Sequence, residues 1–313
     1  MNKRSIIDGS FANGVENYWA DHFGFRDFLI KVNNTINLKV FNKAPTQEII
    51  LGKDNWLFLT NEQPDFEKKS MHSEEIELVV KKLENFAQAL ERKNIEFFFF
   101  VSPNKSTIYP EYLSDSILKP EPGQKSNLEL LNDLLTNSQS LHYLDLRPVL
   151  FEQKQNYRMY PANDSHWTYT GTFFVFQELL SALAEITDIP ATSPTIDFEQ
   201  YKLIDEIHGG EGDIEKLLGS FQATQASEVG QLEITFPDNI NQFPKILWYQ
   251  TSFSDKLKPF LEPYCSQIEY FHFQGQPMKI TLEPNLLGTK IVVFELTERW
   301  LTELIDYKFP DLP

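Results

Sequence analysis

The fold of this chain is decided by the stretch Ile-Glu-Phe-Phe-Phe-Phe-Val at residues 95–101, which runs directly into Ser-Pro-Asn-Lys at residues 102–105. The stretch is short, aromatic and almost entirely apolar, which is typical of a strand that is buried on both faces. Strands of that kind occur in parallel sheets, because helices cover both of their faces. The stretch therefore predicts a core strand of an α/β protein, followed by a loop that is free to carry functional side chains.

Short apolar strands and amphipathic helices alternate along most of the chain. We expect further strands at residues 142–146, 246–249, 268–271 and 291–296, and helices at residues 73–92, 128–135, 170–186, 253–264 and from Arg299 onward. A strand–turn–strand hairpin is predicted at residues 48–59, and one or two helices at residues 15–40. Strands that alternate with helices indicate an α/β sandwich with a mainly parallel central sheet.

Residues 188–243 do not follow this alternation of strands and helices. They combine several prolines with the cluster Gly209-Gly210-Glu211-Gly212, and their periodicity is weak. We therefore expect a small insertion or lid at residues 188–243, within a single domain that spans residues 1–313.

The composition limits the functions that are open to the chain. A chain of 313 residues with 26 Phe can bury a large core and is not disordered. The formal net charge of -17 repels phosphate backbones and anionic lipids, so neither a nucleic-acid partner nor electrostatic docking to a membrane is expected. The single cysteine, Cys265, excludes an internal disulfide and a Cys-based zinc site. The sequence shows no recognisable signal peptide and no apolar run of membrane-spanning length.

Ser252 lies on a turn between an expected strand and an expected helix that starts at Phe253. In open α/β sheets, such turns at the carboxyl ends of strands present side chains to ligands. The backbone N–H of Ser252 is expected to point from a helix N-terminus, whose partial positive charge suits a developing oxyanion. Taken alone, the turn is better explained by Ser252 or Ser254 acting as a simple helix cap.

Asp164 and His166 lie together in a loop ahead of the helix expected at residues 170–186. A serine nucleophile needs a base such as histidine, and the base needs a carboxylate that orients its ring. An Asp two residues before a His can reach Nδ1 across a tight turn, so Ser252, His166 and Asp164 are a candidate catalytic triad. The alternatives are an Asp-x-His loop without a role, and a two-ligand metal site for which no third ligand stands at a helpful spacing.

Six segments of the chain, in order, resemble the signature motifs of the AlgX/AlgJ-like SGNH hydrolase domain of alginate-type polysaccharide O-acetyltransferases. The Asp-Ser-His-Trp segment at residues 164–167 resembles the motif that holds the family's catalytic Asp and His, and Gln-Thr-Ser-Phe-Ser at residues 250–254 takes the place of its Gly-Asp-Ser-Phe-Ser nucleophile loop. The other four segments are residues 16–27, 52–58, 102–111 and 295–299. The resemblance implies an SGNH-hydrolase-like three-layer sandwich with a permuted motif order, in which the Asp/His motif precedes the serine.

The resemblance also implies a function. Members of the family move an acetyl group through an acyl-serine intermediate onto hydroxyls of an exopolysaccharide or cell-envelope glycan. They act outside the cytoplasm, in the periplasm or at the cell envelope, and receive acetyl groups with the help of a membrane-bound O-acyltransferase. Neither a cofactor nor a metal is expected, and the expected partner is a polysaccharide acceptor.

Gln250 and Thr251 depart from the Gly and Asp that precede the serine in the family motif. In the family, the Asp helps to hold the serine turn. In this chain, the loss of the glycine restricts how closely an acyl group approaches the backbone. The departure leaves two alternatives to an acetyltransferase open. One is a catalytically degenerate scaffold that acts in polysaccharide binding or assembly, and the other is a carbohydrate acetylesterase.

Three further residues are candidates for oxyanion or substrate contacts. Asn104 is a candidate second oxyanion donor, or a cap of its own loop. Lys105 either attracts an anionic acceptor or is simply solvated. Trp167 either stacks on a sugar ring or, as is more common for a large aromatic at a helix start, belongs to the core.

Overall fold

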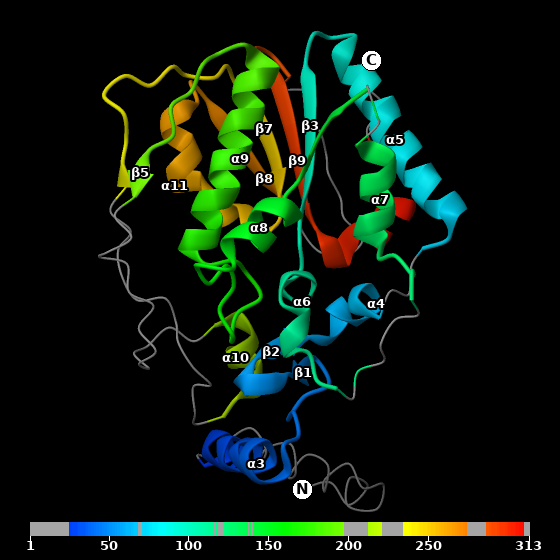
Figure 1. The fold of residues 1–313 in the computed structure, drawn as a ribbon, viewed down its shortest axis with the longest axis vertical. Coiled ribbons are helices and arrows are strands. Elements are labelled where there is room, and N and C mark those ends of the chain that lie inside the picture. Colours follow the sequence, from blue (N-terminus) through cyan, green and yellow to red (C-terminus); the bar gives the residue numbers. More distant parts are fainter. Residues whose placement is uncertain are drawn as a thin grey trace, which may run out of the picture.

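The computed structural model describes residues 25–67, 71–115, 117, 122–136, 138, 140–196, 212–220, 234–273 and 286–309. Its centre is a five-stranded sheet in the order β4-β3-β9-β7-β8, and every neighbouring pair of strands is parallel (Figure 1). The five strands are β3 (Glu96–Ser102), β4 (His142–Asp145), β7 (Ile246–Gln250), β8 (Ile268–His272) and β9 (Ile291–Thr297). The predicted α/β architecture with a parallel sheet is confirmed.

Alternate residues of β3 point to opposite faces of the sheet, as the period of a strand requires. Phe98 and Phe100 belong to one apolar core, and Phe97 and Phe99 to a second core on the other face. Burial of apolar area of this size is the main stabilising contribution to such a fold. The prediction that residues 95–101 form a strand with two buried faces is therefore confirmed.

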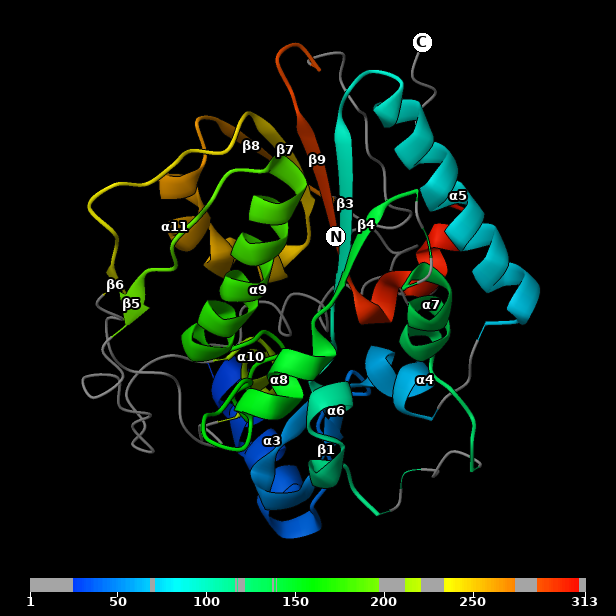
Figure 2. The same ribbon diagram turned by 45° about the horizontal axis from the view of Figure 1, so that its top comes forward.

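Helices cover both faces of the sheet (Figure 1 and Figure 2). On one face lie α5 (Ser73–Glu91), α7 (Asn127–Leu135) and the 3₁₀ helix η6 (Glu298–Ile305), and on the other lie α8 (Arg147–Gln153), α9 (Tyr169–Thr187) and α11 (Lys258–Leu261). The start of α9 is fixed by Thr168, whose hydroxyl accepts the backbone N–H of Gly171 at 2.9 Å. That cap also fixes where the preceding loop, with Asp164 and His166, enters the helix.

The carboxyl ends of the strands face a smaller layer of short elements (Figure 1). The predicted hairpin is present as the antiparallel pair β1 (Ile49–Leu51) and β2 (Leu57–Leu59), joined through η1 (Lys53–Asn55). It is followed by η2 (Thr60–Glu62) and α4 (Gln63–Phe66), while α6 (Lys105–Ile108) and η3 (Pro110–Tyr112) follow β3. The helix predicted within residues 15–40 is present as α3 (Arg26–Phe41), and its part before residue 25 lies outside the described residues.

The helix predicted at residues 253–264 is broken into three pieces. These are the 3₁₀ helix η4 (Ser252–Leu257), α11 and the 3₁₀ helix η5 (Glu262–Tyr264). Pro259 and Pro263 each stand in the first turn of a new piece. Proline has no backbone N–H to donate and clashes with the preceding turn, so it starts a helical piece more readily than it continues one.

Only part of residues 188–243 is described. The short strands β5 (Thr195–Ile196) and β6 (Ile234–Thr235) pair antiparallel, and α10 (Asp213–Leu218) lies against the β1-β2 hairpin. Residues 197–211 and 221–233 lie outside the described residues, so the insertion or lid stays a prediction. Across the described ranges, no helix has both the length and the hydropathy of a membrane span.

Candidate active site

Ser252, His166 and Asp164 meet at the carboxyl edge of the sheet in one series of hydrogen bonds. Ser252 Oγ lies 2.7 Å from His166 Nε2, and His166 Nδ1 lies 2.8 Å from Asp164 Oδ1. Ser252 is exposed, while the side chains of His166 and Asp164 keep 21% and 25% of their area accessible. The two loops singled out in the sequence, 86 residues apart, therefore come together with the hydroxyl open to solvent.

Asp164 orients the imidazole from within a single tight turn. Its Oδ1 also accepts the backbone N–H of His166 at 2.8 Å, and its Oδ2 accepts the backbone N–H of Asp213 at 3.1 Å. Burial raises the pKa of Asp164, but the hydrogen bonds from His166 and Asp213 outweigh burial and hold that pKa well below its usual range. The ionised carboxylate favours a proton on Nδ1 of His166, which leaves Nε2 to accept the proton of Ser252.

Lys105 holds this loop by its backbone. Its ammonium group donates to three carbonyl oxygens of residues 161–164, including that of Asp164 at 2.7 Å. Its stem is fully buried, and the ammonium lies 5.7 Å and 5.3 Å from the ring centroids of Trp56 and Phe58. Burial lowers the pKa of Lys105 to about 8, against the opposing effect of nearby carboxylates.

Asp213, in α10, is a second carboxylate beside the imidazole that sequence reasoning missed. Its Oδ2 lies 3.5 Å from His166 Nδ1, and its Oδ1 accepts the backbone N–H of Ser165 at 2.6 Å. Asp213 stands 49 residues after Asp164, in a segment of weak periodicity, so no local pattern links the two.

Asp213 supplies the third ligand that the metal alternative lacked in the sequence. One ligand atom each of Asp164, His166 and Asp213 lies within 4.8 Å of the others. However, both ring nitrogens of His166 are already in hydrogen-bond contact, Nδ1 with Asp164 Oδ1 at 2.8 Å and Nε2 with Ser252 Oγ at 2.7 Å. The contacts that these three groups make fit a triad better than a metal site.

The serine turn is capped by Thr251 and not by a serine. Thr251 Oγ1 accepts the backbone N–H of Phe253 at 3.4 Å, while Ser254 Oγ accepts from Trp248 Nε1 at 3.2 Å. The helix that follows is the six-residue 3₁₀ helix η4, and not the α-helix expected. Ser252 has no capping role, so the alternative of a simple serine cap is not supported.

Glu295, on β9, binds the serine turn from the neighbouring strand. It is fully buried, and its carboxylate accepts the backbone N–H of Thr251 at 2.6 Å and the Thr251 hydroxyl at 2.9 Å. Ser102 Oγ donates to the same carboxylate at 2.6 Å, and Ser254 Oγ at 3.3 Å. The signal in the sequence was one acidic residue inside an otherwise apolar strand, since a buried carboxylate needs hydrogen-bond donors.

Gln250, which stands at the glycine position of the family motif, is turned away from the triad. It is fully buried, and its side-chain amide contacts Asp255 Oδ1 at 2.9 Å and His272 Nε2 at 2.7 Å. His272 received no role from the sequence. The Gln250 side chain is therefore held against β8 and η4.

Asn104, Lys105 and Trp167 were candidates for oxyanion or substrate contacts, and the structure buries all three completely. The Asn104 amide donates to Asp65 Oδ2 at 2.9 Å, and the Trp167 ring N–H donates to the Phe253 carbonyl oxygen at 3.0 Å. Because their donors are already used and their side chains have no exposed area, these residues support the loops of the site. The core alternative therefore applies to Trp167. For Asn104 and Lys105, neither the substrate contact nor the stated alternative, a side-chain cap for Asn104 and a solvated Lys105, is supported.

A group of buried acids lies behind α6. Glu298 Oε2 accepts the backbone N–H of Asn104 at 2.8 Å and the Thr107 hydroxyl at 2.7 Å, and Asp65 lies close by. Burial raises the pKa of Glu298 to about 7, and burial together with Glu298 raises the pKa of Asp65 to about 8. These acids hold the loop after β3 and do not contact the triad.

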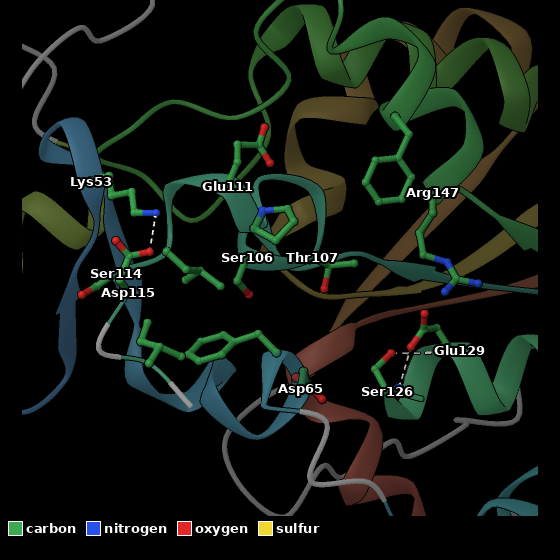
Figure 3. A pocket seen from close by; sticks show the side chains of 15 residues that line it. Lys53, Asp65, Ser106, Thr107, Glu111, Ser114, Asp115, Ser126, Glu129 and Arg147 are labelled. Atoms are coloured by element: carbon green, nitrogen blue, oxygen red, sulfur yellow. Dashed lines mark hydrogen bonds and ion pairs between the residues drawn. The ribbon is translucent and has the colours of Figure 1, made fainter. Parts of the chain in front are cut away.

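A cavity of about 490 Å³ opens beside α6 (Figure 3). Ser106, Thr107 and Arg147 line it, together with Asp65 from α4 and with Lys53, which pairs with Asp115 at 2.8 Å. None of the triad residues belongs to its lining. The chemistry of the site is therefore assigned from the hydrogen-bonded triad and not from this cavity.

A hydrogen-bonded Ser–His–Asp series at the carboxyl edge of a parallel α/β sheet is one of the architectures found among serine hydrolases and acyltransferases. The sequence model described as "SGNH hydrolase-like domain, acetyltransferase AlgX" matches residues 49–240. The chain belongs to this family, as its motifs had indicated. The matched range includes Asp164 and His166 and ends before Ser252.

The chain is similar to the probable alginate O-acetylases AlgJ of Pseudomonas syringae pv. tomato, with 24% identity over 181 residues, and of Pseudomonas aeruginosa, with 22% identity over 190 residues. These alignments cover 58% and 59% of this chain, and 44% and 46% of the relatives. The chain therefore spans less than half the length of the curated relatives it matches.

Solved structures share the fold. The O-acetyltransferase domain of Pseudomonas putida AlgJ matches with a TM-score of 0.52 and 19% identity, covering 81% of this chain and 92% of that domain. Bacillus cereus PatB1, solved with a sulfonyl adduct, matches with a TM-score of 0.54 and 15% identity, covering 83% of this chain and 100% of PatB1. At these identities the matches establish the fold alone.

Proposed function

We propose that this chain is a serine-dependent O-acetyltransferase that acts on glycan hydroxyls, with Ser252 as nucleophile, His166 as base and Asp164 as the carboxylate that orients it. The observation that carries the proposal is the unbroken series of contacts from Ser252 Oγ through His166 to Asp164, at 2.7 Å and 2.8 Å. Family membership supports the reaction class. The permuted order of the SGNH motifs, with Asp164 and His166 before Ser252, belongs to the same proposal.

In the first half-reaction, Ser252 Oγ attacks the carbonyl carbon of an acetyl donor while His166 Nε2 takes the hydroxyl proton. The tetrahedral intermediate collapses, the donor's alcohol leaves with that proton, and an acetyl ester remains on Ser252. In the second half-reaction His166 removes the proton of a glycan hydroxyl, whose oxygen takes the acetyl group. Ser252 recovers its proton from His166, so the enzyme is unchanged.

The backbone N–H of Ser252 is the first candidate donor to the oxyanion. Within the described residues it donates no hydrogen bond, whereas its neighbours Thr251 and Phe253 use theirs in the turn. An oxyanion donor of this kind contributes about 3 kcal/mol to stabilisation of the transition state. We therefore propose this N–H, and not the Asn104 side chain, as the oxyanion donor.

The charge of the chain favours an uncharged glycan as acceptor. Residues 188–243 hold eleven Asp and Glu against two Lys, and the whole chain has a formal charge of -17. Lys105 donates to three backbone carbonyls, and Lys258 pairs with Asp255 at 2.6 Å. A polyuronate would meet repulsion that salt screens. We therefore expect transfer to a uronate oligomer to be slower than to a neutral one at low salt, and the two rates to converge as salt increases.

By its family resemblance, we propose that the chain acts in the periplasm or at the cell envelope and receives acetyl groups with the help of a membrane-bound O-acyltransferase. The relatives' names associate them with alginate. For this chain, an exopolysaccharide or cell-envelope glycan is the acceptor class that we propose.

Two other functions are tested by the same experiment. The purified chain and Ser252→Ala are incubated with p-nitrophenyl acetate, with and without oligosaccharides. An acetyltransferase releases nitrophenol and yields acetylated sugar by mass spectrometry, while an acetylesterase yields only acetate. Equal rates for the chain and Ser252→Ala would identify a non-catalytic scaffold, and a rate abolished by a chelator would favour the metal alternative.

A further inference from the structure

The carboxylate of Glu295 is the only group in the described residues that binds the backbone N–H of the residue just before Ser252. It accepts that N–H of Thr251 at 2.6 Å and also the hydroxyls of Thr251 and Ser102. Glu295 itself is fully buried in β9, between β3 and β7. One side chain thus ties the serine turn to the two strands that flank β9.

We infer that Glu295 is a positioning residue for Ser252: by fixing the peptide group of Thr251, it sets the direction in which the Ser252 hydroxyl leaves the backbone. This inference rests on the proposed function, since it assigns Glu295 a role in that reaction. The hydrogen bonds of Glu295 within the described residues go to Ser102, Thr251 and Ser254, and not to Ser252 or His166, so its effect is transmitted through the turn.

The turn needs a hydrogen-bond acceptor at this place. A buried N–H without a partner is strongly unfavourable, so without Glu295 the turn would relax to find another acceptor. In the family motif, an Asp at the position of Thr251 brings its own carboxylate to the turn. Here Thr251 brings a hydroxyl, and Glu295 brings the carboxylate from the next strand. A threonine at residue 251, in place of the family's Asp, is therefore compatible with a Ser252 hydroxyl that is held in a fixed direction.

What the serine turn requires from Glu295 is a hydrogen-bond acceptor for the N–H of Thr251, and not a negative charge. Burial raises the pKa of Glu295, whereas the hydrogen bonds from Ser102, Thr251 and Ser254 lower it. A glutamine has the same shape and retains one acceptor for the N–H of Thr251, while its amide group can donate to hydroxyl oxygens. A methionine fills the space but offers no comparable acceptor.

The test compares Glu295→Met with Glu295→Gln. For hydrolysis of p-nitrophenyl acetate, Glu295→Met should lower kcat about 10- to 100-fold with little change in KM, because misplacement of a nucleophile has effects of that size. Glu295→Gln should retain kcat to within about 3-fold. Glu298→Met is the matched control: it removes a buried carboxylate three residues away that holds Asn104 and Thr107 and not the serine turn. It should destabilise the fold with a much smaller effect on kcat.

Crystal structures of the variants supply a readout that does not depend on turnover. The separation of Ser252 Oγ and His166 Nε2, 2.7 Å in the wild type, should exceed hydrogen-bond distance in Glu295→Met and stay short in Glu295→Gln and Glu298→Met. A short separation in Glu295→Met overturns the positioning role, even if the wild type proves inactive. Unchanged kcat in Glu295→Met, with Ser252→Ala inactive, overturns it while the proposed function stands.

If Glu295→Met does not fold, Ser102→Ala decides. It removes a hydroxyl donor that fixes the Glu295 carboxylate, keeps the chain's charge and leaves the Thr251 cap of the serine turn in place. A fall in kcat without a matching rise in KM supports the inference, and an unchanged kcat contradicts it.

Discussion

The two halves of the candidate site are built in different ways. In the histidine loop, Asp164 and His166 stand two residues apart, and one carboxylate spans the turn with two hydrogen bonds of 2.8 Å. In the serine turn, the carboxylate that holds Thr251 stands 44 residues away on another strand. The family match follows the same division, since it includes the histidine loop and ends before the serine turn. The histidine loop also has tertiary support, from Lys105 and Asp213. The contact that orients the imidazole is nevertheless local, whereas the contact that fixes the serine turn comes from another strand.

The largest effect is expected in the half that is encoded locally. His166→Ala removes the base, so kcat/KM for ester hydrolysis should fall by at least about 10³-fold. The histidine ring is partly exposed, so the variant should remain folded with little change in melting temperature. Retained activity in a folded His166→Ala variant would show that another group takes the serine proton.

The second largest effect distinguishes the roles of the two carboxylates beside the His166 imidazole, those of Asp164 and Asp213. Asp164→Asn should lower kcat about 10²- to 10⁴-fold, because the amide no longer fixes the tautomer of His166. Asp213→Asn should lower it by about 10-fold or less, because Asp213 Oδ2 lies 3.5 Å from Nδ1, against 2.8 Å for Asp164 Oδ1. Steady-state kinetics of the two variants measures the difference. The opposite order would give Asp213 the orienting role.

The sequence predicted the parts of the molecule that local patterns encode. The apolar run at residues 95–101 indicated a strand with two buried faces, and the loop with Asp164 and His166 could be interpreted as one unit. Asp213 could not be predicted, because it comes from a segment of weak periodicity and reaches the site only through the packing of α10. The break of the helix after Ser252 follows from Pro259 and Pro263, each of which stands in the first turn of a new helical piece.

The roles of Asn104, Lys105 and Trp167 could not be decided from the sequence. Each lies beside a motif and has a chemically attractive side chain, so a substrate contact and a structural role were both open. Burial decides the question, and burial depends on contacts far apart in the chain. The Lys105 ammonium, for example, is used by carbonyl groups up to 59 residues away.

Lys105 also provides a test of how the histidine loop is held. Lys105→Met leaves three backbone carbonyls without their donor and should lower the free energy of unfolding by about 2 to 4 kcal/mol. Lys154→Met is the control, because that lysine contacts a single carbonyl, of Ile108, and pairs with the exposed Glu111. Its effect should be about 1 kcal/mol or less. Urea titration of both variants checks the comparison, and equal losses would contradict it.

The smallest effect concerns the pH dependence of stability. The pKa of Glu298 is raised in the folded state from 4.5 to about 7, so the folded protein binds the proton more tightly than the unfolded chain. Stability from this group is present in full below pH 4.5 and declines as the pH rises towards 7. Glu298→Gln should therefore make the melting temperature less dependent on pH between about 5 and 7. A slope equal to that of the wild type would show that Glu298 does not titrate there.

The central claim is that Ser252 becomes acetylated. The most direct measurement is mass spectrometry of the chain after brief incubation with p-nitrophenyl acetate, followed by peptide mapping, with Ser252→Ala treated in parallel. We expect one acetyl group on Ser252 that is lost when an acceptor is added, and none at that site in His166→Ala. Acetyl groups only on lysines, or equal labelling in the wild type and His166→Ala, would contradict the account.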